Sequence, residues 1–238
     1  MSLEEDFVKF LTSEGAIKFS RGKGDLFVFK MGRKSPNYVN MGHLTDGKSL
    51  NKIKTAFAQK IMELLKEGRI EDFDFVFGLA YRGITLAALA CEGLSELYGI
   101  NRRLIYDRKE MKAYGDKKAD QIIIGASHFK PGSRILVVDD VITTGETKTE
   151  AIEKLKALGD YKIAGMVIAV DRQEKMGDAV DVQDLSASEM MARDYGINVF
   201  PIIKMSDIFE VMKDKVSAEN KRLWVEYYEK YGAVKLAS

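Results

Sequence analysis

The stretch Arg134-Ile-Leu-Val-Val-Asp-Asp-Val-Ile-Thr-Thr-Gly-Glu-Thr147 changes from apolar to acidic to hydroxyl-rich over a short distance. Its uninterrupted apolar run, residues 135–138, is typical of a strand that is buried on both faces of a parallel sheet. Asp139 and Asp140 follow where we expect that strand to end, and Gly145 permits close backbone approach at the start of a helix. Free N–H groups at a helix start bind phosphate. The order of these residues predicts a phosphate site beside a pair of carboxylates.

The side chains of this stretch indicate which phosphate compound it binds. The hydroxyls of Thr143, Thr144 and Thr147 can donate to a phosphate, while the two carboxylates can accept hydrogen bonds from a sugar. That combination suits a ribose 5-phosphate better than a nucleoside triphosphate. The same residues also have a purely structural explanation, because two acids after a strand often form a solvated turn and Thr-Thr-Gly-Glu-Thr is a good helix cap. Residue types alone leave both explanations open.

Strand-like and helix-like patterns alternate from about residue 50 to about residue 203. Such alternation is typical of an α/β domain with a mainly parallel sheet flanked by helices. Ligands of these sheets bind outside the carboxyl ends of the strands, and Gly78, Asp139 and Asp171 all lie at predicted strand ends. We expect strands at residues 73–77, 103–106, 135–138, 163–170 and 197–203, and helices at residues 53–65, 84–98 and 146–158 and after the capping box Ser186-Ala-Ser-Glu189.

The two ends of the chain lie outside this alternating pattern. Residues 1–45 contain a short helical pattern and a stretch rich in phenylalanine, lysine and glycine, and residues 204–238 contain two helical patterns, the second with Trp224. No low-complexity linker or internal repeat separates them from the rest. We therefore expect a single domain of residues 1–238, in which a core of about 46–203 carries a small hood built from both terminal segments.

The composition is that of an ordinary globular protein from a reducing compartment. The formal net charge of +1 gives no electrostatic reason to expect a nucleic-acid surface. No apolar stretch is long enough to span a membrane, and the acidic N-terminus is unlike a signal peptide. Cys91 is the single cysteine, so no internal disulfide can form, and His43 and His128 are the only histidines. We expect a cytoplasmic protein with no membrane or nucleic-acid partner and no protein-built metal site.

Residues 109–125 are polar and rich in lysine, and they interrupt the alternation of strands and helices. A charge-rich run of this kind is most often a solvated surface hairpin. It can also be a mobile lid that brings cations to a polyanionic ligand. Its position between two core strands favours the lid only modestly.

Gly42-His-Leu-Thr-Asp-Gly-Lys-Ser49 matches the pattern of a nucleotide-binding loop, but its surroundings do not. That loop requires a buried strand immediately before it, whereas residues 36–41 include two asparagines and few apolar residues. Asp46 would also face the phosphates with a like charge. We interpret the second half of the motif as the start of the 53–65 helix.

The order of four apolar residues, Asp-Asp, two apolar residues and Thr-Thr-Gly closely resembles the signature of the type I phosphoribosyltransferases. Further segments, in order along residues 15–210, resemble the orotate phosphoribosyltransferases of that family. They are a substrate-binding segment, Phe27-Val-Phe-Lys-Met-Gly-Arg-Lys-Ser-Pro-Asn-Tyr38, a pyrophosphate loop, Gly78-Leu-Ala-Tyr-Arg-Gly83, a catalytic loop, Tyr106-Asp-Arg-Lys-Glu-Met-Lys-Ala-Tyr-Gly115, and an orotate-carboxylate segment, Asp171-Arg-Gln-Glu174.

The resemblance implies a fold, a reaction and a cofactor. The fold would be that of a type I phosphoribosyltransferase. The reaction would transfer the ribose 5-phosphate of phosphoribosyl pyrophosphate (PRPP) to orotate, giving orotidine 5′-monophosphate (OMP) and pyrophosphate in de novo pyrimidine synthesis. Mg²⁺ would bridge the pyrophosphate and the ribose hydroxyls, with few direct protein ligands. The family also implies a homodimer in which lid residues reach the neighbouring active site.

The resemblance also implies roles for individual residues. Negative charge accumulates on the departing pyrophosphate, so preplaced cations and N–H donors are needed. The catalytic residues would be Lys109, Lys112, Asp139 and Asp140. The residues in contact with orotate would be Lys30, Tyr38, Val39, Thr143 and Arg172, the last holding the carboxylate with two hydrogen bonds. The residues in contact with PRPP would be Lys30, Tyr81, Arg82, Arg108, Lys109, Lys112, Tyr114, Asp139, Asp140, Val141, Ile142, Thr143, Thr144, Gly145, Glu146 and Thr147.

The chain departs from the family pattern in ways that concern rate and base choice. Tyr114 stands where histidine is common, and a tyrosine cannot exchange a proton near pH 7 as histidine does. The other departures are Tyr38-Val39 in place of an aromatic pair, Gly78-Leu79 in place of Gly-Pro, and Arg82 where lysine is frequent.

Two other functions compete with orotate transfer. One is phosphoribosyl transfer to a purine or another base, which the combination of Lys30 and Arg172 disfavours. The other is a regulator that senses PRPP without turnover. A regulator of this kind usually adds a nucleic-acid surface, which the near-neutral charge argues against, and Lys109 and Lys112 favour turnover.

Overall fold

The computed structural model describes residues 2–108, 122–142 and 146–236, with residues 146–148 described by their backbone alone. Among these residues, a six-stranded sheet has the order β12 (Val199–Lys204), β9 (Tyr161–Asp171), β8 (Ser133–Ile142), β5 (Phe75–Gly78), β6 (Arg103–Asp107) and β7 (Ile123–Ile124). The strands from β12 to β6 run parallel, and β7 pairs antiparallel with β6. The mainly parallel sheet is therefore confirmed.

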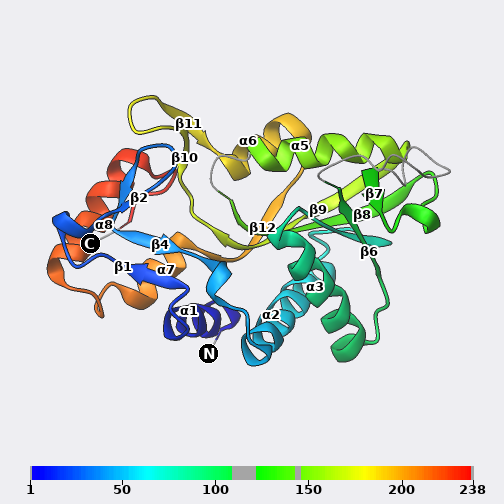
Figure 1. The fold of residues 1–238 in the computed structure, drawn as a ribbon, viewed down its shortest axis with the longest axis horizontal. Helices are drawn as coiled ribbons and strands as arrows, with labels where there is room; N and C mark the ends of the chain where they lie inside the picture. Colours follow the sequence, from blue (N-terminus) through cyan, green and yellow to red (C-terminus); the bar gives the residue numbers. More distant parts are fainter. Residues whose placement is uncertain (1, 109–121, 143–145, 237–238) are drawn as a thin grey trace.

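Helices cover both faces of this sheet (Figure 1). On one face lie α2 (Gly47–Lys66) and α3 (Arg82–Tyr98), and on the other lie α5 (Glu146–Leu155) and α6 (Ala187–Tyr195). The predicted capping box begins α6, since Ser186 and Glu189 each accept a hydrogen bond from the backbone N–H of the other. A 3₁₀ turn, η4 (Lys156–Leu158), follows α5, so the predicted helix ends before Leu158. No described helix is both long and apolar enough to cross a membrane.

Each face of the sheet has its own apolar core, which explains the uninterrupted apolar run of β8. Leu136 and Val138 pack into the core on the α2 and α3 side, whereas Ile135 and Val137 pack into the core on the α5 and α6 side. Successive residues of a strand point to opposite faces of a sheet. A strand with a core on either side is therefore apolar at every position.

β8 is longer than the sequence predicts. We expected it to end at Val138, but its pairing with β9 continues to Ile142, which lies opposite Asp171. The extension is possible because β9 is also a long buried strand, and its last residues pair with both β8 and β12. Asp139 and Asp140 therefore lie within the strand and not after it, so their side chains leave opposite faces of the sheet.

The two terminal segments lie together at one end of the sheet (Figure 1). Trp224 is fully buried there, with its ring 5.3 Å from that of Phe19 and 5.1 Å from that of Phe209. We propose that the terminal segments act as one hood over the sheet. Their elements are α1 (Leu3–Ser13), β1 (Ile17–Phe19), η1 (Lys23–Asp25), β2 (Phe27–Val28), β3 (Lys34–Ser35), β4 (Asn37–Val39), η2 (Met41–His43), α7 (Met205–Met212) and α8 (Ala218–Tyr231).

A hairpin that the sequence does not predict lies between β9 and α6. Its antiparallel strands are β10 (Lys175–Gly177) and β11 (Val182–Ser186). Its turn contacts the β2–β3 hairpin, because the Ala179 N–H donates to the Met31 carbonyl at 3.2 Å. These strands are short and mostly polar, so no alternation of apolar residues marks them in the sequence.

The helix-start interpretation of residues 42–49 is confirmed. Asp46 caps α2, and its carboxylate accepts hydrogen bonds from the N–H groups of Lys48 at 3.0 Å and Ser49 at 3.1 Å. The carboxylate thus takes the N–H groups that a phosphate would need. The preceding strand, β4, pairs with β1 outside the central sheet.

Most of the lysine-rich stretch 109–125 lies outside the described residues. Its final part is described, and Ile123 in β7 is fully buried against the sheet. The 3₁₀ turn η3 (Ala126–His128) follows. The end of the stretch thus forms an antiparallel strand, β7, beside β6, which the sequence does not predict.

Candidate active site

A cavity of about 460 Å³ lies between the hood and the carboxyl ends of β8 and β9. Distant segments of the chain meet around it, as expected for an α/β sheet whose ligand binds at the strand ends. The predicted site residues in its lining are Lys30, Tyr38, Val39, Asp140, Val141 and Arg172. The other lining residues are Phe29, Met31, Arg33, Asn40, Met41, Glu174, Lys175 and Gly177.

The two aspartates of β8 have different surroundings. Asp140 lines the cavity, and its carboxylate also accepts a hydrogen bond from the Val141 N–H at 2.6 Å. Asp139 is buried against the start of α3, where a Cβ added to Gly83 would lie 3.0 Å from the Asp139 carboxylate and 2.7 Å from the Val138 carbonyl. Asp140 therefore lines the cavity, whereas Asp139 does not and lies beside Gly83 at the start of α3.

Arg172 is buried at the edge of the cavity and is held on two sides. Its Nε donates to the Glu174 carboxylate at 2.8 Å, and its Nη2 donates to the same oxygen. Its guanidinium carbon lies 4.2 Å from the centre of the Phe29 ring. Burial is the largest single influence on the guanidinium pKa and would lower it. The charge and hydrogen bond of Glu174, together with Tyr227 and Tyr228, outweigh burial and raise the pKa. Arg172 is therefore a fixed cation and not a surface ion-pair residue.

Aromatic rings form the hood side of the cavity. The Tyr38 ring stacks on Phe27, with 5.5 Å between ring centres, and lies 6.1 Å from Phe29. Val39 is buried beside Tyr38, and Lys30 is exposed at the turn of the β2–β3 hairpin. The predicted orotate contacts Lys30, Tyr38, Val39 and Arg172 thus surround one space.

The loop after β5 carries the predicted residues Tyr81 and Arg82, neither of which lines this cavity. Tyr81 is largely exposed and follows a cis peptide bond. Arg82 is the first residue of α3, and its Nη2 donates to the carbonyls of Met41 and Leu44 in the hood. The described contacts of Arg82 therefore join the sheet to the hood, and its contact with PRPP stays a prediction.

Several predicted residues lie outside the described part of the chain. They are Lys109, Lys112, Tyr114, Thr143, Thr144 and Gly145, and the side chains of Glu146 and Thr147. Arg108 and Ile142 are described at the two edges of these gaps. The Arg108 N–H donates to the Ile122 carbonyl at 2.8 Å, and Ile142 is buried at the end of β8.

Arg33, Glu174 and Lys175 also line the cavity, although no pattern in the sequence predicts a role for them. Glu174 belongs to the Asp171-Arg-Gln-Glu174 segment that resembles the family, but its residue type alone indicates only a surface acid. It is instead buried between Arg33 and Arg172. The sequence offered one indication of a role for Glu174, namely its position two residues after Arg172, the predicted receptor of the orotate carboxylate.

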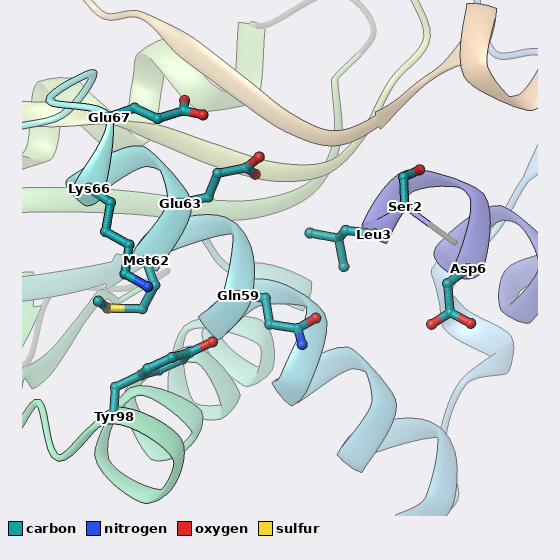
Figure 2. Close-up of a pocket in the computed structure, with 9 residues that line it drawn as sticks. All are labelled: Ser2, Leu3, Asp6, Gln59, Met62, Glu63, Lys66, Glu67 and Tyr98. Atoms are coloured by element: carbon teal, nitrogen blue, oxygen red, sulfur yellow. The ribbon is translucent and has the colours of Figure 1, made fainter.

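A second hollow, of about 590 Å³, lies between α1 and α2 and reaches the end of α3 (Figure 2). Figure 2 shows its lining side chains along one side of α2 and at the start of α1. None of the predicted site residues is among them, and it lies away from the strand ends that bind ligands in such folds. We therefore place the active site at the smaller cavity beside Asp140 and Arg172.

Comparisons with known proteins show the family to which this chain belongs. The family model described as phosphoribosyl transferase domain matches residues 44–188. The orotate phosphoribosyltransferase of Bifidobacterium adolescentis is 35% identical, covering 98% of this chain and 99% of that protein, and that of Neurospora crassa is 40% identical, covering 96% and 95%. A crystal structure of the Francisella tularensis enzyme of the same name has a TM-score of 0.77 and 30% identity, and covers 95% of this chain and 99% of that one. With both chains matched nearly end to end, and with Asp140 and the buried Arg172 at one cavity, this chain belongs to the orotate phosphoribosyltransferase family.

Proposed function

We propose that this chain transfers the ribose 5-phosphate of PRPP to orotate, releasing pyrophosphate and forming OMP for pyrimidine synthesis. The observation that carries the proposal is the position of Arg172, a buried guanidinium in the same cavity as Asp140 of the phosphoribosyl signature. A guanidinium binds a carboxylate with two parallel hydrogen bonds, and orotate is a pyrimidine with a carboxylate. The relatives' names support orotate as the acceptor.

The transfer needs no covalent nucleophile. As pyrophosphate leaves the anomeric carbon, positive charge develops on the ribose and negative charge on the leaving group. The ring nitrogen of orotate forms the new bond and gives up its proton to the leaving group or to solvent. Lys109, Lys112 and Arg108 would stabilise the leaving group, while the loop 143–147 would hold the 5-phosphate. Asp140 would accept hydrogen bonds from the ribose hydroxyls. Arg172, Tyr38 and Lys30 would orient orotate for attack.

We infer that Mg²⁺ is the cofactor. Mg²⁺ prefers carboxylate, phosphate and water oxygens, and the Asp140 carboxylate lines the cavity beside Val141. This donor chemistry fits a hard divalent cation held mainly by the substrate's phosphates, with Asp140 reaching it directly or through water. The ion would neutralise charge on the pyrophosphate. Asp140 would in addition fix the ribose hydroxyls with respect to the anomeric carbon.

We also infer a homodimer and a reducing, cytoplasmic location. The family resemblance supports the dimer, in which lid residues would reach the partner's site. Cys91 supports the location, because it is a free cysteine packed against the core and burial raises its pKa to about 12. A thiol of such high pKa is a packing residue and not a reactive group.

An ultraviolet assay tests the proposed reaction directly. Purified protein is mixed with PRPP, Mg²⁺ and orotate, with uracil and adenine in parallel, and loss of each base is followed. We expect rapid loss of orotate alone. Replacing Arg172 with lysine should raise the KM for orotate by roughly tenfold or more while leaving the KM for PRPP nearly unchanged.

The matched control is Arg193→Lys, which makes the same change at an exposed arginine of α6. It should behave as the wild type. Consumption of another base in place of orotate would contradict the proposal that orotate is the acceptor. Tight PRPP binding without consumption of any base would indicate a sensor.

A further inference from the structure

Glu174 is a buried carboxylate shared by two arginines and a tyrosine of the C-terminal helix. One oxygen accepts from Nε and Nη2 of Arg172. The other accepts from Arg33 Nη1 at 3.4 Å and from the Tyr227 hydroxyl at 3.1 Å. Arg33, Arg172, Glu174 and Tyr227 are each at most 5% exposed. All hydrogen-bonding capacity of this carboxylate is thus directed at the protein, and none is left for a ligand.

Arg33 is engaged elsewhere as well. Its Nε donates to the Asp178 carbonyl at 3.0 Å, its Nη1 to the Lys175 carbonyl at 2.8 Å and its Nη2 to the Met176 carbonyl at 3.1 Å. Each nitrogen of its guanidinium is therefore bound to the β10–β11 hairpin. Arg33 joins that hairpin to the β2–β3 hairpin and balances part of the Glu174 charge.

Arg172, in contrast, retains an open edge. One edge of its guanidinium is bound to Glu174 and one face lies on Phe29. Its Nη1 donates to no described residue, and the side chain lines the cavity. Because Glu174 holds one edge of this planar guanidinium and Phe29 covers one face, the guanidinium is fixed in a single orientation. Its remaining N–H donors therefore face the cavity as a fixed pair.

The backbone between the two residues also has an unusual conformation. Gln173 has a φ of 50°, in the left-handed region that non-glycine residues seldom adopt. It is held there by three hydrogen bonds, in which its N–H donates to Asp171, its carbonyl accepts from the Ala233 N–H and its side chain accepts from the Ser206 N–H. Strained residues of this kind are often found at binding sites. Two parts of the C-terminal segment, at the start of α7 and after α8, therefore shape the turn that brings Glu174 to Arg172.

We propose that Glu174 is a positioning residue for base selection, which orients Arg172 toward the substrate carboxylate, and that Tyr227 of α8 supports it. This inference rests on the proposed function. It assigns the C-terminal helix to the acceptor site, because Tyr227 contacts Glu174 and the Tyr228 hydroxyl donates to the Arg172 carbonyl at 2.5 Å. Burial and the charge of Glu174 both raise the pKa of Tyr227, so its hydroxyl stays a donor.

Binding of OMP and uridine 5′-monophosphate (UMP) separates this role from a general structural one. The two nucleotides differ only in the carboxylate that Arg172 would hold. In the wild-type protein, calorimetry should show tighter binding of OMP than of UMP. In Glu174→Gln the affinity for OMP should fall by roughly tenfold, because a misoriented donor pair loses its bidentate geometry, while the affinity for UMP stays within about twofold.

A tyrosine pair on one helix supplies matched variants that retain both ion pairs. Tyr227→Phe removes the hydroxyl bound to Glu174, whereas Tyr231→Phe removes a hydroxyl bound to the Ala179 carbonyl at 3.1 Å. We expect Tyr227→Phe to weaken OMP binding by about two- to threefold without affecting UMP, and Tyr231→Phe to change neither. These variants keep the test available if Glu174→Gln does not fold.

Failure of the inference and failure of the proposed function give different results. Wild-type protein that does not prefer OMP to UMP, and does not consume orotate, would reject the function itself. Wild-type protein with that preference, together with Glu174→Gln and Tyr227→Phe variants that alter OMP and UMP binding equally, would show that Glu174 is only a structural ion-pair residue.

Discussion

The ammonium group of Lys154 lies 2.6 Å from the buried carboxylate of Asp107, and this contact joins α5 to the end of β6. The other oxygen of Asp107 accepts from the Ala80 N–H at 3.2 Å, and Lys154 also donates to the Arg108 carbonyl at 3.2 Å. Asp107 thus connects the loop after β5, the strand that leads to residue 109 and the helix that follows the phosphate loop.

Replacing Asp107 with asparagine should reduce catalysis more than stability. Asparagine can still accept from Ala80 but loses the charge that holds Lys154, so the three segments lose their common position. We expect kcat/KM for PRPP to fall by roughly 10- to 100-fold, since a misplacement of about 1 Å can cost about 100-fold. Steady-state kinetics at saturating orotate measures the effect.

The control for this prediction is Lys154→Met, which leaves the Asp107–Ala80 hydrogen bond in place. Because it removes the same ion pair from the other side, it should lower kcat/KM for PRPP by a similar factor. A wild-type rate for Asp107→Asn would mean that the junction has no catalytic importance.

Replacing Gly83 with alanine should disturb the start of α3 and the end of β8 together. The added Cβ would lie 2.7 Å from the Val138 carbonyl and 3.0 Å from the Asp139 carboxylate, and the backbone oxygen cannot move aside cheaply. We expect a loss of about 1–3 kcal/mol in the free energy of unfolding, as for other overpacked sites. Chemical denaturation followed by circular dichroism measures it.

Gly47→Ala is the matched control, because a Cβ at Gly47 meets nothing within 4 Å and the residue lies in the first turn of α2. It should be neutral or slightly stabilising. Equal stability of the two variants would show that α3 can shift away from β8 without cost.

Replacing the buried Asp171 with asparagine should stabilise the folded protein at neutral pH. Burial raises the pKa of Asp171 above its ordinary value of 3.8, against opposing hydrogen bonds from Gln173 and Ser188. A carboxyl whose folded pKa is raised contributes stability below its unfolded pKa and loses it as pH rises through the folded pKa. Asp171→Asn should therefore have a higher Tm at pH 7, and the difference should close as pH falls toward about 3.8.

Asp178→Asn provides a control of opposite sign. Hydrogen bonds from the backbone N–H groups of Val180 and Asp181 lower the pKa of Asp178, so its contribution is present at neutral pH and lost on acidification. A Tm difference for Asp171→Asn that does not change between pH 4 and pH 7 would contradict the assignment. Calorimetry across this pH range gives both curves.

Trp224 should report on the unfolding of the hood, because it is the single tryptophan of the chain. One apolar core contains Trp224, the α1 residue Phe7 and the sheet residue Val167. Its emission and the far-ultraviolet circular dichroism should therefore change together in denaturant. An emission change at lower denaturant concentration would mean that the hood unfolds before the sheet. Trp224→Ala should cost about 3–5 kcal/mol of stability.

Elements with a strong local signal were predictable from the sequence. The apolar run of β8, the α3 helix and the capping box at Ser186 follow from neighbouring residues, because periodicity and capping are short-range effects. The phosphate signature and the choice of Arg172 as carboxylate receptor also came from short motifs. Asp140 and Arg172 line one cavity, and their roles there stay predictions.

The amino-acid sequence by itself determined the order of the core strands β5, β6, β8, β9 and β12 and the residue types near their carboxyl ends, because those properties belong to contiguous residues. The tertiary structure alone decided which residues complete the site. β8 extends to Ile142 because β9 offers an edge of that length, and Glu174 is buried because Arg33, Arg172 and Tyr227 neutralise and bind it there. A buried charge is stable only with partners. Those partners come from distant parts of the chain, so no local pattern could identify them.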